Sequence, residues 1–209
     1  MENQKLIQQG AEAKILLNEK DNYIIKDRIE KSYRLKELDV KIRKLRTRQE
    51  TKLLEKASKI IDSPLPNEQK DKNSTKITMP FIKGKKLSEY LDKLSEKHAM
   101  NVCEKIGASL AQLHDNNIIH GDLTTSNLIL DKKEKVWFID FGLGFHSMKL
   151  EDKAVDLHLI KEALEAKHYK NHEKYFNHIL QGYNLSKNHK ETIERLKKVE
   201  SRGRYKERY

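Results

Sequence analysis

The sequence predicts an α+β protein with two lobes, a small antiparallel β-sheet carrying one long helix and then a reduced, mainly α-helical part. Three observations predict this class. Short apolar runs alternate with turn-forming residues in the first third, a long segment with helical periodicity follows, and further helical patterns dominate the remainder. The predicted lobes cover residues 1–82 and 83–200, and a basic tail covers 201–209. Because ligands commonly bind in clefts, we expect a site between the two lobes.

Three strands are expected at the start of the chain. They cover Lys5–Gln9, Lys14–Leu17 and Tyr23–Lys26, and the segments 10–13 and 18–22 that separate them have turn chemistry. Strands joined by tight turns form an antiparallel meander.

A long helix and a fourth strand complete the first lobe. Apolar residues recur at helical spacing from about Lys36 to Lys59. Asp62–Thr75 holds two of the three prolines and is expected to be a loop, whereas Lys76–Ile82 returns to strand character and is ended by Lys83 and Gly84.

The second lobe should be mostly helical. Four helices are predicted, over Ala99–Asp115, Asp152–Ala166, His172–Tyr183 and Asn188–Glu200. The region Ile118–Phe145 lies between the first two, and it should contain short strands at Leu128–Leu130 and Val136–Ile139.

Composition excludes several classes of protein. The chain of 209 residues has one cysteine, Cys103, which excludes an intramolecular disulfide framework and a cysteine-based zinc cluster. No apolar run approaches the ~20 residues that span a bilayer, and the first residues lack the apolar stretch of a signal peptide. We therefore expect a cytoplasmic protein that has no membrane partner.

The net charge of +11 is concentrated in two segments. Lys26–Lys59 carries a net +7 and Lys187–Tyr209 a net +5, so the rest of the chain is close to neutral. Such an excess favours a polyanionic partner or ligand, and a solvated helix face or tail is the alternative.

Two motifs carry the chemistry. The first is His120-Gly-Asp-Leu-Thr-Thr-Ser-Asn127, and the second is Asp140-Phe-Gly142. Magnesium prefers hard oxygen ligands, which Asn127 and Asp140 can supply while Asp122 accepts a hydroxyl proton. The combination and its spacing match the catalytic loop and the metal loop of protein kinases, so we predict a minimal protein-kinase-like bilobal fold with Asp122 as the catalytic residue.

A kinase-like site also requires a lysine on the third strand and a glutamate on the long helix. Lys26 ends the third predicted strand, and Glu50 shares a helix face with Leu54, Ala57 and Ile61. A buried carboxylate is costly unless it is paired, so we predict that Lys26 and Glu50 form an ion pair.

The remaining nucleotide contacts are assigned by their position. The turn between the first two strands should cover the phosphates, and it consists of Gly10, Ala11, Glu12 and Ala13. The connection between the lobes should meet the adenine through Met79, Pro80 and Ile82. Pro80 has no N–H to donate, so its carbonyl and the N–H of Ile82 are the expected partners.

Nearly the whole chain resembles one family, the PRPK-like small atypical protein kinases that are subunits of the KEOPS (EKC) complex, called Kae-associated kinases in archaea. The resemblance rests on the two motifs above and on further strings, which are Gly10–Ala13, Lys31-Ser-Tyr-Arg34, Arg46-Thr-Arg-Gln-Glu50, Glu151-Asp-Lys-Ala-Val-Asp-Leu157 and Ser201-Arg-Gly-Arg204.

The chain departs from ordinary protein kinases at three places. Only 15 residues separate Asp140 from Asp156, without an Ala-Pro-Glu string, so there is no room for a long activation segment. Gly121 replaces the usual arginine, and Thr124 stands where many kinases have a lysine beside the γ-phosphate. We expect slow phosphoryl transfer that a partner stimulates.

The resemblance implies an ATP-using Ser/Thr kinase or ATPase that depends on Mg²⁺, with Mn²⁺ as a possible substitute. It also implies three partners, namely the ATPase-like subunit that transfers threonylcarbamoyl, a small subunit on the first lobe, and tRNA. Two alternatives stay open, a small-molecule phosphotransferase of the same fold and a nucleotide-binding scaffold without turnover. The basic tail is either a docking segment or a solvated end.

Overall fold

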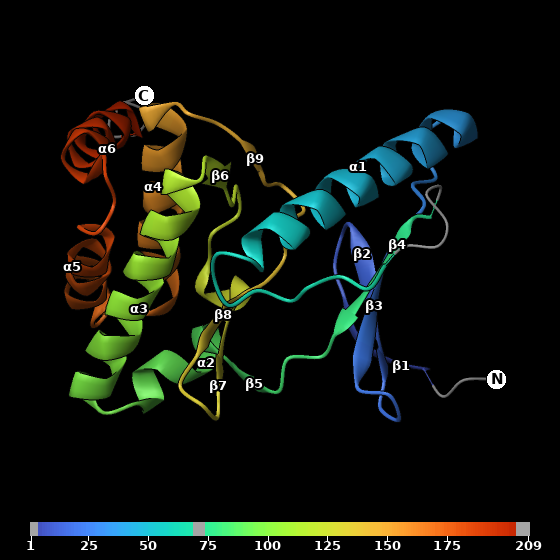
Figure 1. Ribbon diagram of the computed structural model, residues 1–209, viewed down its shortest axis with the longest axis horizontal. Helices are drawn as coiled ribbons and strands as arrows, with labels where there is room; N and C mark the ends of the chain where they lie inside the picture. Colours follow the sequence, from blue (N-terminus) through green and yellow to red (C-terminus); the bar gives the residue numbers. More distant parts are fainter. Residues whose placement is uncertain (1–3, 69–73, 204–209) are drawn as a thin grey trace.

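A computed structural model describes residues 4–68 and 74–203. In Figure 1 the first part of the chain, a sheet crossed by one long helix, lies beside a second part in which helices predominate. The predicted α+β architecture of two lobes is confirmed.

The first lobe is a four-stranded antiparallel sheet in the order β1-β2-β3-β4. Its strands are β1 (Gln4–Gln9), β2 (Ala13–Asn18), β3 (Tyr23–Arg28) and β4 (Lys76–Pro80). Lys26 of β3 lies opposite Ile15 of β2 and Ile77 of β4. Because side chains alternate along a strand, Lys26 and Arg28 project from the same face of the sheet.

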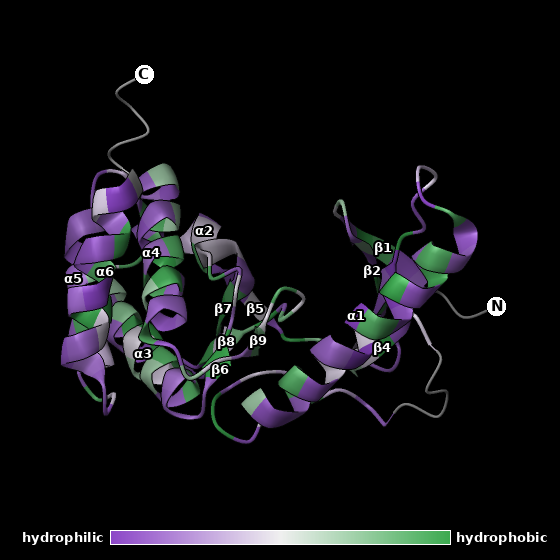
Figure 2. Cartoon of the chain, turned by 90° about the horizontal axis from the view of Figure 1, so that it is seen from above, coloured by the Kyte–Doolittle hydropathy of each residue, from purple (hydrophilic) through white to green (hydrophobic). Residues whose placement is uncertain are grey.

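Helix α1 (Lys36–Ala57) packs only part of its length against the lobe. Its last turns bury Leu53, Leu54 and Ala57, whereas Leu38 and Leu45 are 49% and 55% exposed. Figure 1 shows the first turns of α1 extending past the sheet, and Figure 2 shows apolar residues in this outer part as well. The apolar spacing predicted the helix, but it did not show which half would be buried.

The second lobe begins with elements that the sequence did not predict. They are β5 (Gly84–Lys86), α2 (Leu87–Tyr90) and the 3-10 turn η1 (Leu91–Lys93). The strand that Lys83 and Gly84 were expected to end does not continue through them, but Gly84 also opens β5, where it pairs with Asp131. The preceding strand, predicted to reach Ile82, ends at Pro80.

The catalytic and metal motifs lie among short strands and one 3-10 turn. These elements are β6 (Ile118–Ile119), η2 (Thr125–Asn127), β7 (Leu128–Asp131), β8 (Val136–Phe138) and β9 (Phe145–His146). Strands β7 and β8 form a small sheet with β5, in the order β5-β7-β8, and β6 pairs with β9 in a second small sheet.

Four longer helices form the body of the second lobe. They are α3 (Glu96–Asp115), α4 (Leu150–Lys167), α5 (His172–Tyr183) and α6 (His189–Gly203). All four were predicted, and their observed ends lie within three residues of the expected ones. Helix α6 continues three residues into the expected tail, where Arg202 bonds to Glu151 of α4. The remainder of that tail, residues 204–209, lies outside the described residues.

The apolar core of the second lobe lies between α3, α4 and α5, with Val102, Ile106, Leu157 and Ile179 fully buried. Helices α3 and α5 approach closely at two glycines, Gly107 and Gly182. None of the helices in the described part of the chain is long and apolar enough to cross a membrane.

Candidate active site

A buried cluster of charges joins β3 to α1. The carboxylate of Glu50, which has no exposed side-chain area, accepts from Lys26 Nζ at 2.7 Å and from Arg28 Nη2 at 2.6 Å. The structure therefore brings Lys26 and Glu50 together as expected, and it adds Arg28, which sequence reasoning missed. The signal was present, because Arg28 is two residues after Lys26 on a strand and must share its face.

Lys26 also reaches the second lobe. Its Nζ lies 2.6 Å from Oδ1 of Asp140, and the same oxygen accepts the N–H of Gly142 at 3.1 Å. Burial would lower the pKa of Lys26, but the charges of Glu50 and Asp140 outweigh it and raise the pKa above its usual value. Burial would likewise raise the pKa of Asp140, yet Lys26 holds it below its usual value. Both groups are therefore charged at neutral pH.

Asp122 and Asn127 are locked together in the catalytic loop. The side-chain nitrogen of Asn127 donates to the Asp122 carbonyl at 2.8 Å and to Asp122 Oδ2 at 3.0 Å. Because the nitrogen of this amide is occupied, its oxygen is the atom that remains for a cation.

His120 ties the two motifs to one another. Its Nε2 donates to the carbonyl of Ile139, just before Asp140, at 3.1 Å, and its Nδ1 accepts the N–H of Asp122 at 3.4 Å. The imidazole thus connects the backbone of Asp122 with the residue that precedes Asp140.

The carboxylate of Asp156 on α4 binds the backbone of the catalytic loop. Its two carboxylate oxygens accept the backbone N–H groups of His120 and Gly121 at 2.6 and 2.8 Å, and His114 Nε2 lies 3.3 Å from the carboxylate. Asp156 is completely buried. Sequence reasoning used it only as a member of a family string, and only the fold reveals that it holds the loop in place.

The structure explains why Gly121 replaces the usual arginine. Gly121 has φ +77°, and a Cβ at this position would lie 2.3 Å from the carbonyl oxygen of Leu143. Both the backbone conformation and the close approach of the chain require glycine here.

Replacing Gly121 by alanine should therefore lower the free energy of unfolding by about 2–4 kcal/mol, through strain and the clash with Leu143. Chemical denaturation of both proteins measures this. Gly10→Ala is the matched control, because a Cβ at Gly10 meets its nearest atom at 3.9 Å. Equal denaturation midpoints for Gly121→Ala and wild type would contradict the argument.

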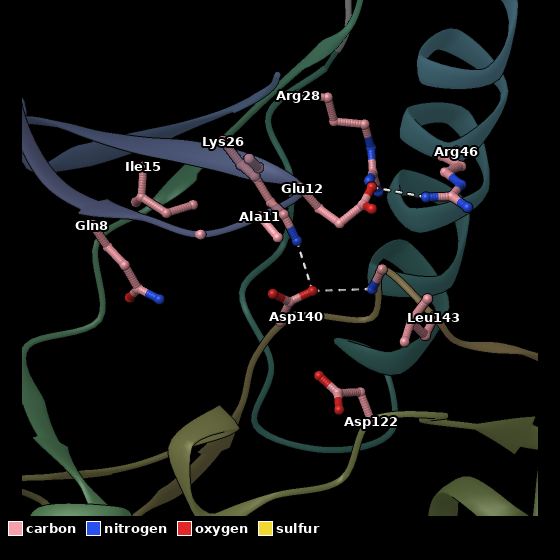
Figure 3. Close-up of a pocket in the computed structure, with 13 residues that line it drawn as sticks. Gln8, Ala11, Glu12, Ile15, Lys26, Arg28, Arg46, Asp122, Asp140 and Leu143 are labelled. Atoms are coloured by element: carbon pink, nitrogen blue, oxygen red, sulfur yellow. Dashed lines mark hydrogen bonds and ion pairs between the residues drawn. The ribbon is translucent and has the colours of Figure 1, made fainter. Parts of the chain in front are cut away.

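Two adjoining cavities occupy the cleft. The first, about 360 Å³, is charged, and Figure 3 shows Lys26, Arg28, Arg46, Asp122 and Asp140 around it. The turn Gly10–Ala13 also lines it. The second, about 150 Å³, is more apolar, and its lining residues include Ile24, Met79, Pro80, Ile82, Glu50 and Asn127.

The expected nucleotide residues thus fall into two groups. Gly10, Ala11, Glu12 and Ala13 line the charged cavity, whereas Met79, Pro80 and Ile82 line the apolar one. Lys26 and Asp140 line both. An apolar slot that opens onto a charged pocket fits a planar base attached to phosphates.

The donor set suits a hard divalent cation that is shared with a ligand. Asn127 and Asp140 both line the apolar cavity, and they offer an amide oxygen and a carboxylate. Among the described residues there is no group of three or more His, Cys, Asp or Glu side chains that could hold a metal. Two protein ligands, completed by phosphate and water, are the usual arrangement for Mg²⁺.

Comparisons with known proteins agree with this geometry. Residues 9–169 match the family model described as protein kinase domain. The chain is 43% identical over 216 residues to the KEOPS complex subunit Bud32 of Pyrococcus abyssi. The aligned region covers 98% of this chain and 97% of that protein. It is 37% identical over 199 residues to the probable serine/threonine-protein kinase BUD32 homolog of Archaeoglobus fulgidus, and that alignment covers 95% of this chain and 94% of the relative.

A further relative is longer. The chain is 43% identical over 206 residues to the probable bifunctional tRNA threonylcarbamoyladenosine biosynthesis protein of Methanobrevibacter smithii. These residues are 96% of this chain and 36% of that protein.

Proposed function

Since the chain belongs to the Bud32 family of protein kinases, we propose that it transfers the γ-phosphoryl group of ATP to a hydroxyl group or to water, as a subunit of the KEOPS complex. In that setting it would support the formation of threonylcarbamoyladenosine in tRNA, in agreement with the name of the bifunctional relative. The observation that carries the proposal is the chain of ion pairs from Glu50 through Lys26 to Asp140, beside Asp122 in one cavity.

Each side chain has a definable task. Glu50 holds Lys26, and Lys26 would bind the α- and β-phosphates. Asp122 would orient the attacking hydroxyl or water and accept its proton. As the new bond from this oxygen to Pγ forms, the bond from Pγ to the β–γ bridging oxygen breaks, and ADP leaves with the electron pair. A divalent cation, which we propose is Mg²⁺ with Mn²⁺ as a substitute, would be held by Asn127 and Asp140 and neutralise phosphate charge.

The departures from ordinary kinases indicate how the reaction is controlled. The 15 residues between Asp140 and Asp156 contain the two-residue strand β9 and the start of α4, so a long activation segment does not fit. We propose that a partner subunit takes its place. The partners we propose are the ATPase-like subunit that transfers threonylcarbamoyl, a small subunit on the first lobe, and tRNA, and the location is the cytoplasm.

ATP turnover should therefore rise several-fold when the partner subunit or tRNA is added to the isolated chain. The measurement counts phosphoprotein and free phosphate separately, because this distinguishes kinase from ATPase activity. An ATP-binding chain with no turnover under any of these conditions would favour the scaffold alternative and overturn the proposal.

A further inference from the structure

The charged cavity has a feature that the phosphate-transfer roles above do not use. Arg46 of α1 lines it, and its Nη1 pairs with Oε2 of Glu12 at 2.8 Å. Figure 3 shows this pair bridging from the helix to the turn between β1 and β2. The turn that should cover the phosphates thus carries a carboxylate into the space where phosphate should bind.

The cations of this cavity all come from the first lobe. Within the described part of the chain its basic lining residues are Lys26 and Arg28 of β3 and Arg46 of α1. The catalytic loop contributes none, because Thr124 stands where many kinases have a lysine. Besides the divalent cation proposed above, the cations that this cavity offers to the γ-phosphate therefore lie on β3 and α1.

Arg46 differs from the other two cations in how firmly it is held. Lys26 and Arg28 are almost fully buried and share the carboxylate of Glu50. The side chains of Arg46 and Glu12 are 37% and 50% exposed, and a pair this exposed contributes little to stability. An incoming phosphate can displace the carboxylate of Glu12 at low cost, and Arg46 can then bind two phosphate oxygens.

We propose that Arg46 binds the γ-phosphate of ATP and that Glu12 occupies Arg46 until the nucleotide arrives. Glu12 is then a built-in competitor, which makes the cavity selective for a nucleotide with a third phosphate. The inference rests on the proposed function, because it requires ATP in this cleft.

The competitor model predicts opposite effects for the two members of the pair. Arg46→Gln should weaken binding of the β,γ-imido analogue of ATP by about tenfold, because a charge-assisted contact is lost. It should leave ADP within about twofold of wild type, since ADP lacks the group that Arg46 contacts. Glu12→Gln should strengthen binding of the analogue about threefold by removing the competing anion.

Titration calorimetry with ADP and with the imido analogue, both in Mg²⁺, tests this without relying on activity. Arg48→Gln is the matched control, because Arg48 is an exposed arginine on the same helix and does not line either cavity. It should change neither affinity. Glu12→Gln keeps the test decisive if Arg46→Gln folds poorly.

The possible failures are separable. If wild type binds neither nucleotide, the proposed function fails. If wild type binds both, but Arg46→Gln weakens ADP and the analogue equally or weakens neither, only the role of Arg46 is overturned. A weaker affinity of Glu12→Gln for the analogue would show that Glu12 aids binding, which overturns the competitor role.

Discussion

Replacing Asp140 by asparagine should reduce ATP turnover by roughly 10²–10³-fold or more, because one negative charge is lost where we propose that the cation and the phosphates meet. Asn is almost the same size and can still accept the N–H of Gly142, so the loop should keep its shape. Lys26 retains Glu50 at 2.7 Å, and the buried charges of the first lobe stay paired. The loss should therefore appear in catalysis and metal dependence, with the fold intact.

Steady-state release of phosphate, measured at several Mg²⁺ concentrations, checks this result. Asp27→Asn is the control, because Asp27 is the neighbour of Lys26 on β3 and projects from the opposite face of the sheet. Asp122→Asn should cause a comparable loss without changing the metal dependence, since in the proposed mechanism Asp122 acts on the attacking oxygen. Near-normal turnover in both site variants would rule out the proposed reaction.

Replacing Gly107 by alanine should destabilise the second lobe by about 3–5 kcal/mol, which would lower the melting temperature by about 10 °C for a chain of this size. A Cβ at Gly107 would lie 1.9 Å from the carbonyl oxygen of Ile179, and one at Gly182 would lie 2.0 Å from that of Glu104. In both cases the atom that the added Cβ would clash with belongs to the backbone of the neighbouring helix. Helices α3 and α5 would have to move apart, and the core between them would lose contacts.

Thermal unfolding followed by circular dichroism measures the effect. Asn101→Ala is the control, because Asn101 is exposed on the same helix. Alanine is the better helix former, so the melting temperature of this variant should equal that of wild type or rise slightly. A Gly107→Ala midpoint equal to that of wild type would show that α3 and α5 can separate freely at this crossing.

Much of the site could be predicted because its residues lie in short contiguous strings. Asp122 and Asn127 are five residues apart on one loop, and Asp140 follows a strand, so their spacing is visible without the fold. Lys26 and Glu50 are 24 residues apart, yet helix periodicity indicated an inward position for Glu50, and the kinase-like motifs required a lysine on the third strand. Their ion pair then followed from the cost of burying an unpaired carboxylate.

Other contacts could not be predicted, because they join segments that only folding brings together. Asp156 meets the backbone of His120 from 36 residues away, and Arg46 meets Glu12 across 34 residues and two different elements. The short strands β5, β6 and β9 have too few residues to show a period. They exist because a distant partner supplies their hydrogen bonds.

The residues alone therefore determined the class of fold, the two motifs and the identity of the main charged groups, since each depends on local periodicity or on fixed spacing. Only the tertiary structure decided which charges face one another. It paired Arg46 with Glu12 at the charged cavity, joined Lys26 to Asp140 of the second lobe, and required glycine at position 121. These outcomes depend on distances between elements, and no local pattern in the chain encodes them.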